Sequence, residues 1–140
     1  MRMRISIVAA LLAVGLATPS AADDLTGTDK FLCTAMQATR CSPDAACTSG
    51  PPWNWNIPQF IEIDLGAKQL RTTKASGENR STPTKNHERA NGAVALQGIE
   101  GRLAFSFVIV QSTGEMAVAV ATPDFTTSVF GACTPLTAQH

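Results

Sequence analysis

The sequence predicts an all-β fold: a small antiparallel meander that closes into a barrel or a sandwich and is tied by disulfides. Three observations point to it. Apolar and polar residues alternate along several short segments, which is the period of a half-buried strand. Clusters of Gly, Pro, Asn, Asp and Ser separate these segments, so consecutive strands can pair as hairpins. Four cysteines are available to crosslink them.

Six segments are expected to form strands, because they alternate or are rich in β-branched and aromatic residues. In chain order they are residues 31–41, 60–65, 93–97, 103–110, 116–121 and 125–133. The first could also be a helix; we favour a strand because Cys33 would then lie in a ladder beside the last strand. In the fourth segment Phe105 and Phe107 alternate with smaller side chains, which turns one face toward a core.

Two segments do not fit this description. Residues 47–59 form a connection rich in Pro, Gly and Trp. Residues 71–91 contain no aliphatic side chain larger than Ala and cannot fill a core. We therefore expect them to form a long exposed hairpin or a mobile loop outside the barrel. The stretch from Lys68 to Arg89 is also basic, with six basic residues against two acidic ones.

Residues 1–22 have the pattern of a cleavable secretory signal. Arg2 and Arg4 give a basic start, an apolar run follows, and Ser20-Ala21-Ala22 is a small-residue cleavage site. Residues 23–140 would then form a single β domain. No later stretch approaches the roughly 20 apolar residues of a transmembrane helix. The sequence thus predicts a periplasmic or secreted protein without a membrane span.

The charge balance argues against nucleic acid as a partner. The whole chain has eleven basic and eleven acidic residues, and two of the basic ones fall in the leader, so the mature chain is slightly acidic. The basic stretch could still dock an anionic protein, a polysaccharide or lipid headgroups. Alternatively, it could be a solubilising hairpin whose charges discourage edge-to-edge strand pairing.

Four cysteines after a signal peptide favour two disulfides. Of the three possible pairings we predict Cys41–Cys47, which closes a short turn-rich stretch, and Cys33–Cys133, which joins the first strand to the last. The spacings do not match the CxxC pairs of a structural zinc site. We therefore predict no metal.

No motif identifies a catalytic residue. His87 and His140 form neither a zinc-protease nor a serine-triad pattern, and no phosphate or dinucleotide loop occurs. We assign no catalytic site and expect no cofactor. Glu62 and Asp64 project from one face of their strand, about 6.6–7 Å apart along it. Paired carboxylates at such a separation can hydrolyse glycosidic bonds, but a solvated strand face gives the same pattern.

Candidate binding residues lie in the two unusual segments. Trp53 and Trp55 are two residues apart, so their rings could face the same way as a platform for a sugar or a peptide. They could equally plug one end of a barrel. The basic segment supplies the other candidates. The complete set is Trp53, Trp55, Lys74, Ser76, Arg80, Lys85 and Arg89.

A signal peptide followed by a small, cysteine-tied β domain resembles small periplasmic proteins of Gram-negative bacteria, including the periplasmic C-type lysozyme inhibitors. In those small antiparallel barrels an early cysteine joins one near the C-terminus, as predicted here for Cys33 and Cys133. Their inhibitory loop carries a Ser-Gly-x-x-Tyr motif. Ser76 and Gly77 match it, but Arg80 stands at the tyrosine position and the chain contains no Tyr. The resemblance thus covers the architecture and two residues.

The sequence favours an exported, non-enzymatic protein that binds a partner through its loops. A rigid scaffold with unusual loops and no catalytic motif supports this expectation. Inhibition of lysozyme or of another hydrolase is one alternative. Hydrolysis by Glu62 and Asp64 is the other.

Overall fold

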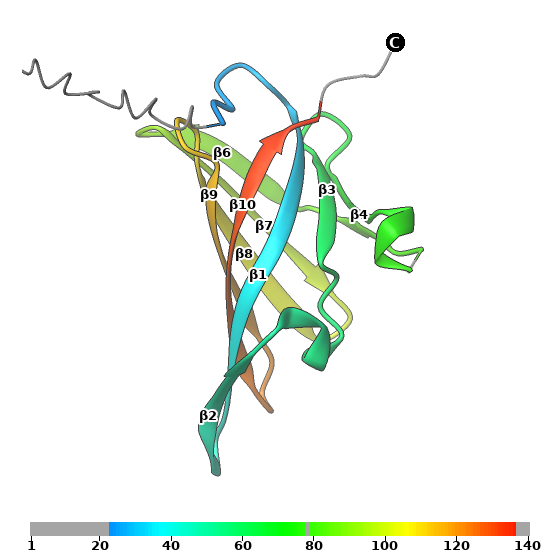
Figure 1. The fold of residues 1–140 in the computed structure, drawn as a ribbon, viewed down its shortest axis with the longest axis vertical. Coiled ribbons are helices and arrows are strands. Elements are labelled where there is room, and N and C mark those ends of the chain that lie inside the picture. The colour runs from blue at the N-terminus through cyan, green and yellow to red at the C-terminus, as the bar shows by residue number, and fades with distance from the viewer. Residues whose placement is uncertain (1–22, 78, 137–140) are drawn as a thin grey trace, which may run out of the picture.

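A single antiparallel sheet forms most of the described structure. The computed structural model describes residues 23–77 and 79–136, so the predicted leader lies outside the described residues. Within them the chain forms ten strands and two short 3-10 helices (Figure 1). The strands are β1 (Lys30–Ser42), β2 (Ala45–Gly50), β3 (Phe60–Asp64), β4 (Gln69–Thr72), β5 (Ser81–Pro83), β6 (Asn86–Ala90), β7 (Ala93–Glu100), β8 (Leu103–Val110), β9 (Glu115–Ala121) and β10 (Thr126–Pro135). The helices are η1 (Pro52–Trp55) and η2 (Lys74–Ser76). The all-β prediction is confirmed.

The sheet curls into a half-barrel (Figure 1). Its strand order is β5-β4-β3-β1-β10-β9-β8-β7-β6, and β2 pairs with β1 beside this path. From β6 to β10 each strand pairs with the next one in the chain, which is the predicted meander. The long first strand, β1, then lies between β10 and β3. None of the described helices has the length and apolar character needed to cross a membrane.

Residues 71–91 hold the two edges of the sheet together, which corrects the expectation of a hairpin or loop outside the barrel. They contain β5 and β6, the two edge strands, which are separated only by Thr84 and Lys85. The Thr84 N–H donates to the Lys68 carbonyl at 2.9 Å, and the Lys85 N–H donates to the Gln97 carbonyl at 2.8 Å. The connection between β5 and β6 is therefore hydrogen-bonded both to the residue before β4 and to β7. Polar and charged residues suffice here because the ladder hydrogen bonds come from the backbone.

The six predicted strands correspond to β1, β3, β7, β8, β9 and β10. The opening segment is a strand and not a helix, and Cys33 lies opposite Cys133 in the ladder between β1 and β10. The sequence pattern does not predict β2, β4, β5 or β6. These four strands are short, and among their residues only Leu70 and Thr82 are buried.

Both predicted disulfides are present. The Cys33–Cys133 bridge, with an S–S distance of 2.03 Å, joins β1 to β10 inside the barrel. The Cys41–Cys47 bridge, with an S–S distance of 2.04 Å, closes the hairpin of β1 and β2. Cys33 and Cys133 are both buried. The long bridge therefore contributes to the core as well as crosslinking the chain.

One end of the barrel is closed by the segment that precedes β1. Leu25 is fully buried there, and its N–H donates to the Gln111 carbonyl at 2.7 Å. Arg89 of β6 lies at the same end. Its guanidinium donates to the Thr28 carbonyl and pairs with Asp29 at 3.1 Å. This closed end leaves the opposite end as the place where the interior can open to solvent.

A β-bulge in β1 changes which of its side chains face the interior. The pairing of β1 with β10 shifts register between Ala35 and Gln37. Before the bulge Cys33 and Ala35 are buried, and after it Ala38 is buried. The inward positions thus change from odd to even numbers. Because of this change Arg40 projects toward the interior.

Candidate binding cavity

The end of the barrel opposite Leu25 contains an open cavity of about 280 Å³. The cavity walls are apolar side chains from the inner faces of the strands. They include Ile61, Leu70, Leu103, Phe107, Val118 and Val129. The alternation that predicts the strands supplies this lining, because each strand turns its large apolar residues inward. Apolar walls with a few polar groups are the usual composition of a small-molecule site.

A glycine makes room in the cavity wall. Gly98 of β7 pairs with Phe105 of β8, and an ideal Cβ at Gly98 would lie 2.3 Å from the tip of the Phe105 ring. The ring therefore occupies the space that a side chain at position 98 would take. It also meets Phe107 edge to face, with ring centroids 5.8 Å apart. The Phe105 ring thus lies over β7 and is part of the cavity lining.

The helix η1 carries the two tryptophans to different places. Trp55 is half-buried and lines the cavity, whereas Trp53 is 58% exposed. Successive residues of a 3-10 helix are about 120° apart around its axis, so residues two apart do not face the same way. The rings therefore form no joint platform. Of the two, only Trp55 lines the cavity at the end of the barrel, the location that the plug alternative predicted.

Arg40 projects from β1 into the cavity. Its guanidinium lies 3.8 Å from the centroid of the Phe125 ring and 5.6 Å from that of the Trp55 ring, a cation–π arrangement. Its Nε donates to the Thr127 hydroxyl at 3.0 Å. Burial lowers the pKa of Arg40 from its ordinary value, but an arginine stays protonated in proteins. Within residues 23–77 and 79–136, no carboxylate pairs with it.

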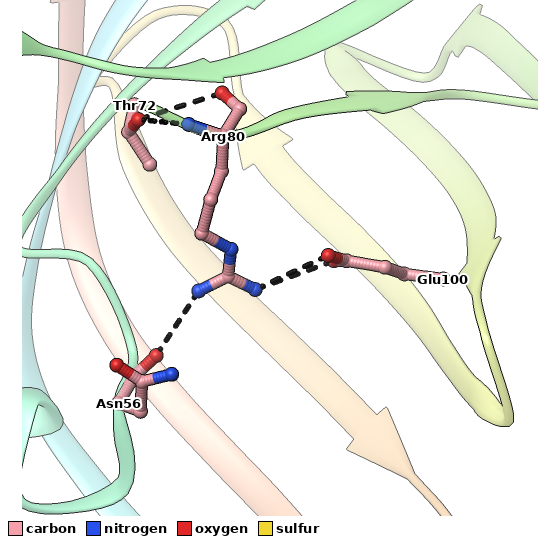
Figure 2. Close-up of polar contacts among 4 residues, drawn as sticks. All are labelled: Asn56, Thr72, Arg80 and Glu100. Carbon is pink, nitrogen blue, oxygen red and sulfur yellow. Dashed lines mark hydrogen bonds and ion pairs between the residues drawn. The ribbon is translucent and has the colours of Figure 1, made fainter. Parts of the chain in front are cut away.

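A second arginine crosses the rim of the cavity (Figure 2). Arg80 pairs with Glu100 at 3.3 Å and donates from Nη1 to the Asn56 carbonyl at 3.3 Å. Its backbone N–H donates to the Thr72 hydroxyl at 2.8 Å. These contacts join β4, the residue after η1 and the end of β7. Arg80 therefore ties three parts of the rim together.

The predicted basic surface is divided between the two ends of the barrel. Arg80 is at the open rim and Arg89 is at the closed end, each with an acidic partner. Lys74 and Lys85 are exposed and do not line the cavity. The structure thus brings Trp55 and Arg80 to the cavity and does not gather the predicted basic residues into one patch.

Glu62 and Asp64 share the outer face of β3, and neither lines the cavity. Asp64 accepts a hydrogen bond from the Ala67 N–H at 2.9 Å and pairs with Lys30 at 3.6 Å. The backbone hydrogen bond from Ala67, aided by the charge of Lys30, lowers the pKa of Asp64, although partial burial opposes the shift. A glycosidase acid needs a raised pKa, so these contacts do not favour that role. In the part of the chain that the structure describes, no three metal-ligating side chains come together.

The residues that stack at the cavity, Arg40 and Phe125, are absent from the sequence-based set of candidates. The signal that could have identified Arg40 is a charged residue within an otherwise apolar or small-residue strand. Its direction depends on the bulge, so the same pattern also fits an outward, solvated arginine. Phe125 precedes β10 by one residue and belongs to a segment predicted as strand.

Comparisons with protein-family models, with curated proteins and with solved structures give no match to this chain. The resemblance to C-type lysozyme inhibitors therefore stays a prediction. The functional proposals depend on the cavity and on the residues around it.

Proposed function

We propose that the protein is an exported, non-enzymatic binding protein that holds a small, mainly apolar ligand in the open end of its barrel. The observation that carries the proposal is a cavity of about 280 Å³ with apolar walls and with polar groups at its rim. This volume is near the lower end of the roughly 300–1,000 Å³ range of small-molecule sites. The proposal keeps the binding role expected from the sequence but moves it from the loops into the barrel.

Export to the periplasm or to the outside of the cell is part of the same proposal. Two disulfides fit an oxidising compartment of this kind, and the predicted leader would supply the route. The mature chain would begin at Asp23. The intact mass of the protein recovered from the exporting cell tests this, because retention of residues 1–22 would contradict it.

Filling the cavity tests the binding role. Val118 of β9 is 7% exposed and lines the cavity, whereas Val108 of the neighbouring β8 faces outward and is 48% exposed. We expect titration calorimetry to detect binding of decanol, an uncharged apolar probe, to the wild-type protein and to Val108→Phe. Val118→Phe should bind decanol at least about tenfold more weakly, because the added ring occupies the site.

The two phenylalanine variants are matched in chemistry and differ in the face they occupy. Circular dichroism and thermal unfolding establish that each one folds. Wild-type protein that takes up no decanol would overturn the proposal. So would a folded Val118→Phe variant that binds decanol as tightly as Val108→Phe does.

Two other proposals come from the sequence, and the cavity favours neither. Inhibition of lysozyme would use the loop around Ser76, whose hydroxyl accepts from the Phe60 N–H at 3.2 Å and donates to the Phe60 carbonyl at 3.1 Å. Hydrolysis would use Glu62 and Asp64. Titration of the protein against lysozyme tests the first, and a panel of glycoside substrates tests the second. Unchanged lysozyme activity at large molar excess and absence of turnover would remove them.

A further inference from the structure

We infer that the ligand is a small amphiphile with one anionic head, a carboxylate in the simplest case, and that Arg40 receives this head while the apolar body lies in the cavity. The inference rests on the proposed binding function and specifies its ligand. It follows from three properties of the site: the surplus charge, the geometry of Arg40 and the size of the cavity.

Among the residues that the structure describes, the charged side chains of the cavity leave a surplus of one positive charge. They are Arg40, Arg80 and Glu100. Arg80 and Glu100 pair with each other, and Arg40 has no acidic partner among the described residues. Arg40 is half-buried, and even partial removal of a cation from water without a counter-charge carries a cost. The stacking on Phe125 offsets part of that cost, and a bound anion would offset more.

The contacts of Arg40 leave one edge of its guanidinium for a ligand. The Nε is used by the Thr127 hydroxyl, and the face of the group lies over Phe125. No described residue accepts a hydrogen bond from the two Nη atoms. A planar edge of this kind matches the two oxygens of a carboxylate, and charge-assisted bonds are stronger than neutral ones. The ring contacts hold the guanidinium in place before the ligand arrives, so little further ordering is needed.

Arg80 is less suited than Arg40 to bind the anionic head group of the ligand. Its guanidinium already contacts Glu100 and the Asn56 carbonyl (Figure 2). An anion that approached it would meet the negative charge of Glu100 at the same place. Arg80 and Glu100 are also about 40% exposed at the side chain, 39% and 44% respectively, so solvent screens them. The geometry therefore favours Arg40.

The size of the cavity limits the apolar body. At about 280 Å³, the cavity is near the lower end of the range of small-molecule sites. One medium-length aliphatic chain or a small aromatic system fits this volume. A double-chain lipid does not. Decanoate and its neutral and cationic analogues are therefore suitable probes.

A charge series on the wild-type protein tests the inference without any mutation. Decanoate, decanol and decyltrimethylammonium share the same chain and differ in the head. We expect titration calorimetry at pH 7 to rank them in that order, with decanoate at least about tenfold tighter than decanol. Equal affinities for decanoate and decanol would overturn the anionic head and leave the cavity as a binding site. Failure of all three to bind would overturn the proposed function as well.

Two matched substitutions test the role of Arg40. Arg40→Met removes the charge inside the cavity, and Arg71→Met removes one from the outer surface, where Arg71 bonds to Gln69. We expect Arg40→Met to lose at least about tenfold in affinity for decanoate and to keep its affinity for decanol. Arg71→Met should change neither. A folded Arg40→Met variant that still prefers decanoate would overturn the inference.

The fluorescence of Trp55 gives an independent reading of where the head lies. In a Trp53→Phe background, Trp55 is the only tryptophan of the chain, and its ring is close to Arg40. We expect decanoate to change its emission in that background, and the change to be lost with Arg40→Met. If Arg40→Met does not fold, Arg40→Lys retains the charge without the planar edge and should bind decanoate more weakly than wild type but still more tightly than decanol. A Lys variant without this preference would contradict the inference.

Discussion

Gly131 allows β1 and β10 to approach each other beside the bulge. An ideal Cβ at this position would lie 2.0 Å from the Thr34 carbonyl oxygen and 2.9 Å from the Met116 Cε. The oxygen belongs to the backbone of the neighbouring strand and cannot move without disturbing the ladder. We expect Gly131→Ala to lower the free energy of unfolding by about 2–4 kcal/mol, in the range of overpacking and backbone displacement.

Urea or thermal unfolding measures this loss, and Gly66→Ala is the matched control. A Cβ at Gly66 would have its nearest neighbour, the Asp64 Oδ1, at 3.5 Å, which is ordinary contact. The control should change the free energy of unfolding by less than about 0.5 kcal/mol. A Gly131→Ala variant as stable as the control would show that the two strands can separate at no cost.

The charge of Asp64 should make a pH-dependent contribution to stability. Its pKa is lowered in the folded state by the Ala67 N–H and by Lys30, so the stabilisation is present above the ordinary aspartate value of about 3.9 and is lost as the pH falls through the lower folded value. We expect Asp64→Asn to cost about 0.5–1 kcal/mol at pH 7. The difference from wild type should shrink below about pH 4. Thermal unfolding from pH 7 to pH 2 measures it, and a constant difference would contradict this origin.

At the scale of single residues, the sequence pattern does not predict the inward direction of Arg40. Alternation correctly places Phe105 and Phe107 on the inner face of β8. In β1 the same alternation, continued from Cys33, would turn Arg40 outward. The bulge between Ala35 and Gln37 reverses it. A bulge inserts one extra residue into a strand through backbone geometry. The side chains of this segment do not predict it.

At the scale of elements, hydrophobic pattern predicts the strands that build the core and misses the strands that close it. The segment 71–91 has no aliphatic side chain larger than Ala, and the sequence interpretation therefore placed it outside the barrel. Its β5 and β6 are nevertheless paired with β4 and β7. Edge strands obtain their stability from backbone hydrogen bonds and from the neighbours that they cover. Composition alone does not report either contribution.

We expect that replacing residues 71–91 by a short Gly/Ser linker abolishes folding. The replacement removes β5, β6, η2 and the second half of β4, together with the buried Thr82 and Thr84. It also leaves the inner face of β7 uncovered. We expect the cooperative unfolding transition seen by circular dichroism to disappear. As a control, a Gly/Ser replacement of equal length for the exposed residues 42–46 should leave that transition. A folded protein without residues 71–91 would show that the edges need not be joined.

At the scale of the whole molecule, the barrel is tied at its seam and open at one end. The Leu136 N–H donates to the Lys30 carbonyl at 2.9 Å, and the Cys33–Cys133 bridge crosses the same pair of strands. Both disulfides and the class of fold could be predicted, because cysteine count and strand spacing reflect the whole chain. The cavity could not, because its existence depends on how far the sheet curls and on which end is closed.

The two disulfides should differ in their effect on stability. In the loop-entropy model a bridge with a sequence separation of 100 is worth about 4–5 kcal/mol, and one with a separation of 6 about 2 kcal/mol. We therefore expect Cys133→Ser to lower the free energy of unfolding more than Cys47→Ser does. Denaturant unfolding of the two variants measures the difference. Equal losses would show that strain or residual structure in the unfolded chain outweighs the length of the loop.

The pairing of the first long strand with the last one sets the order in which the molecule can fold. Each hairpin between β6 and β10 joins strands that follow one another and can form as soon as its second strand has been made. The ladder between β1 and β10 has to wait for the end of the chain, because it runs from Phe31 opposite Pro135 to Cys41 opposite Thr126. Contacts this distant in sequence close late and make folding slow. A chain that stops short of β10 would therefore have hairpins but no barrel, and no place for a ligand.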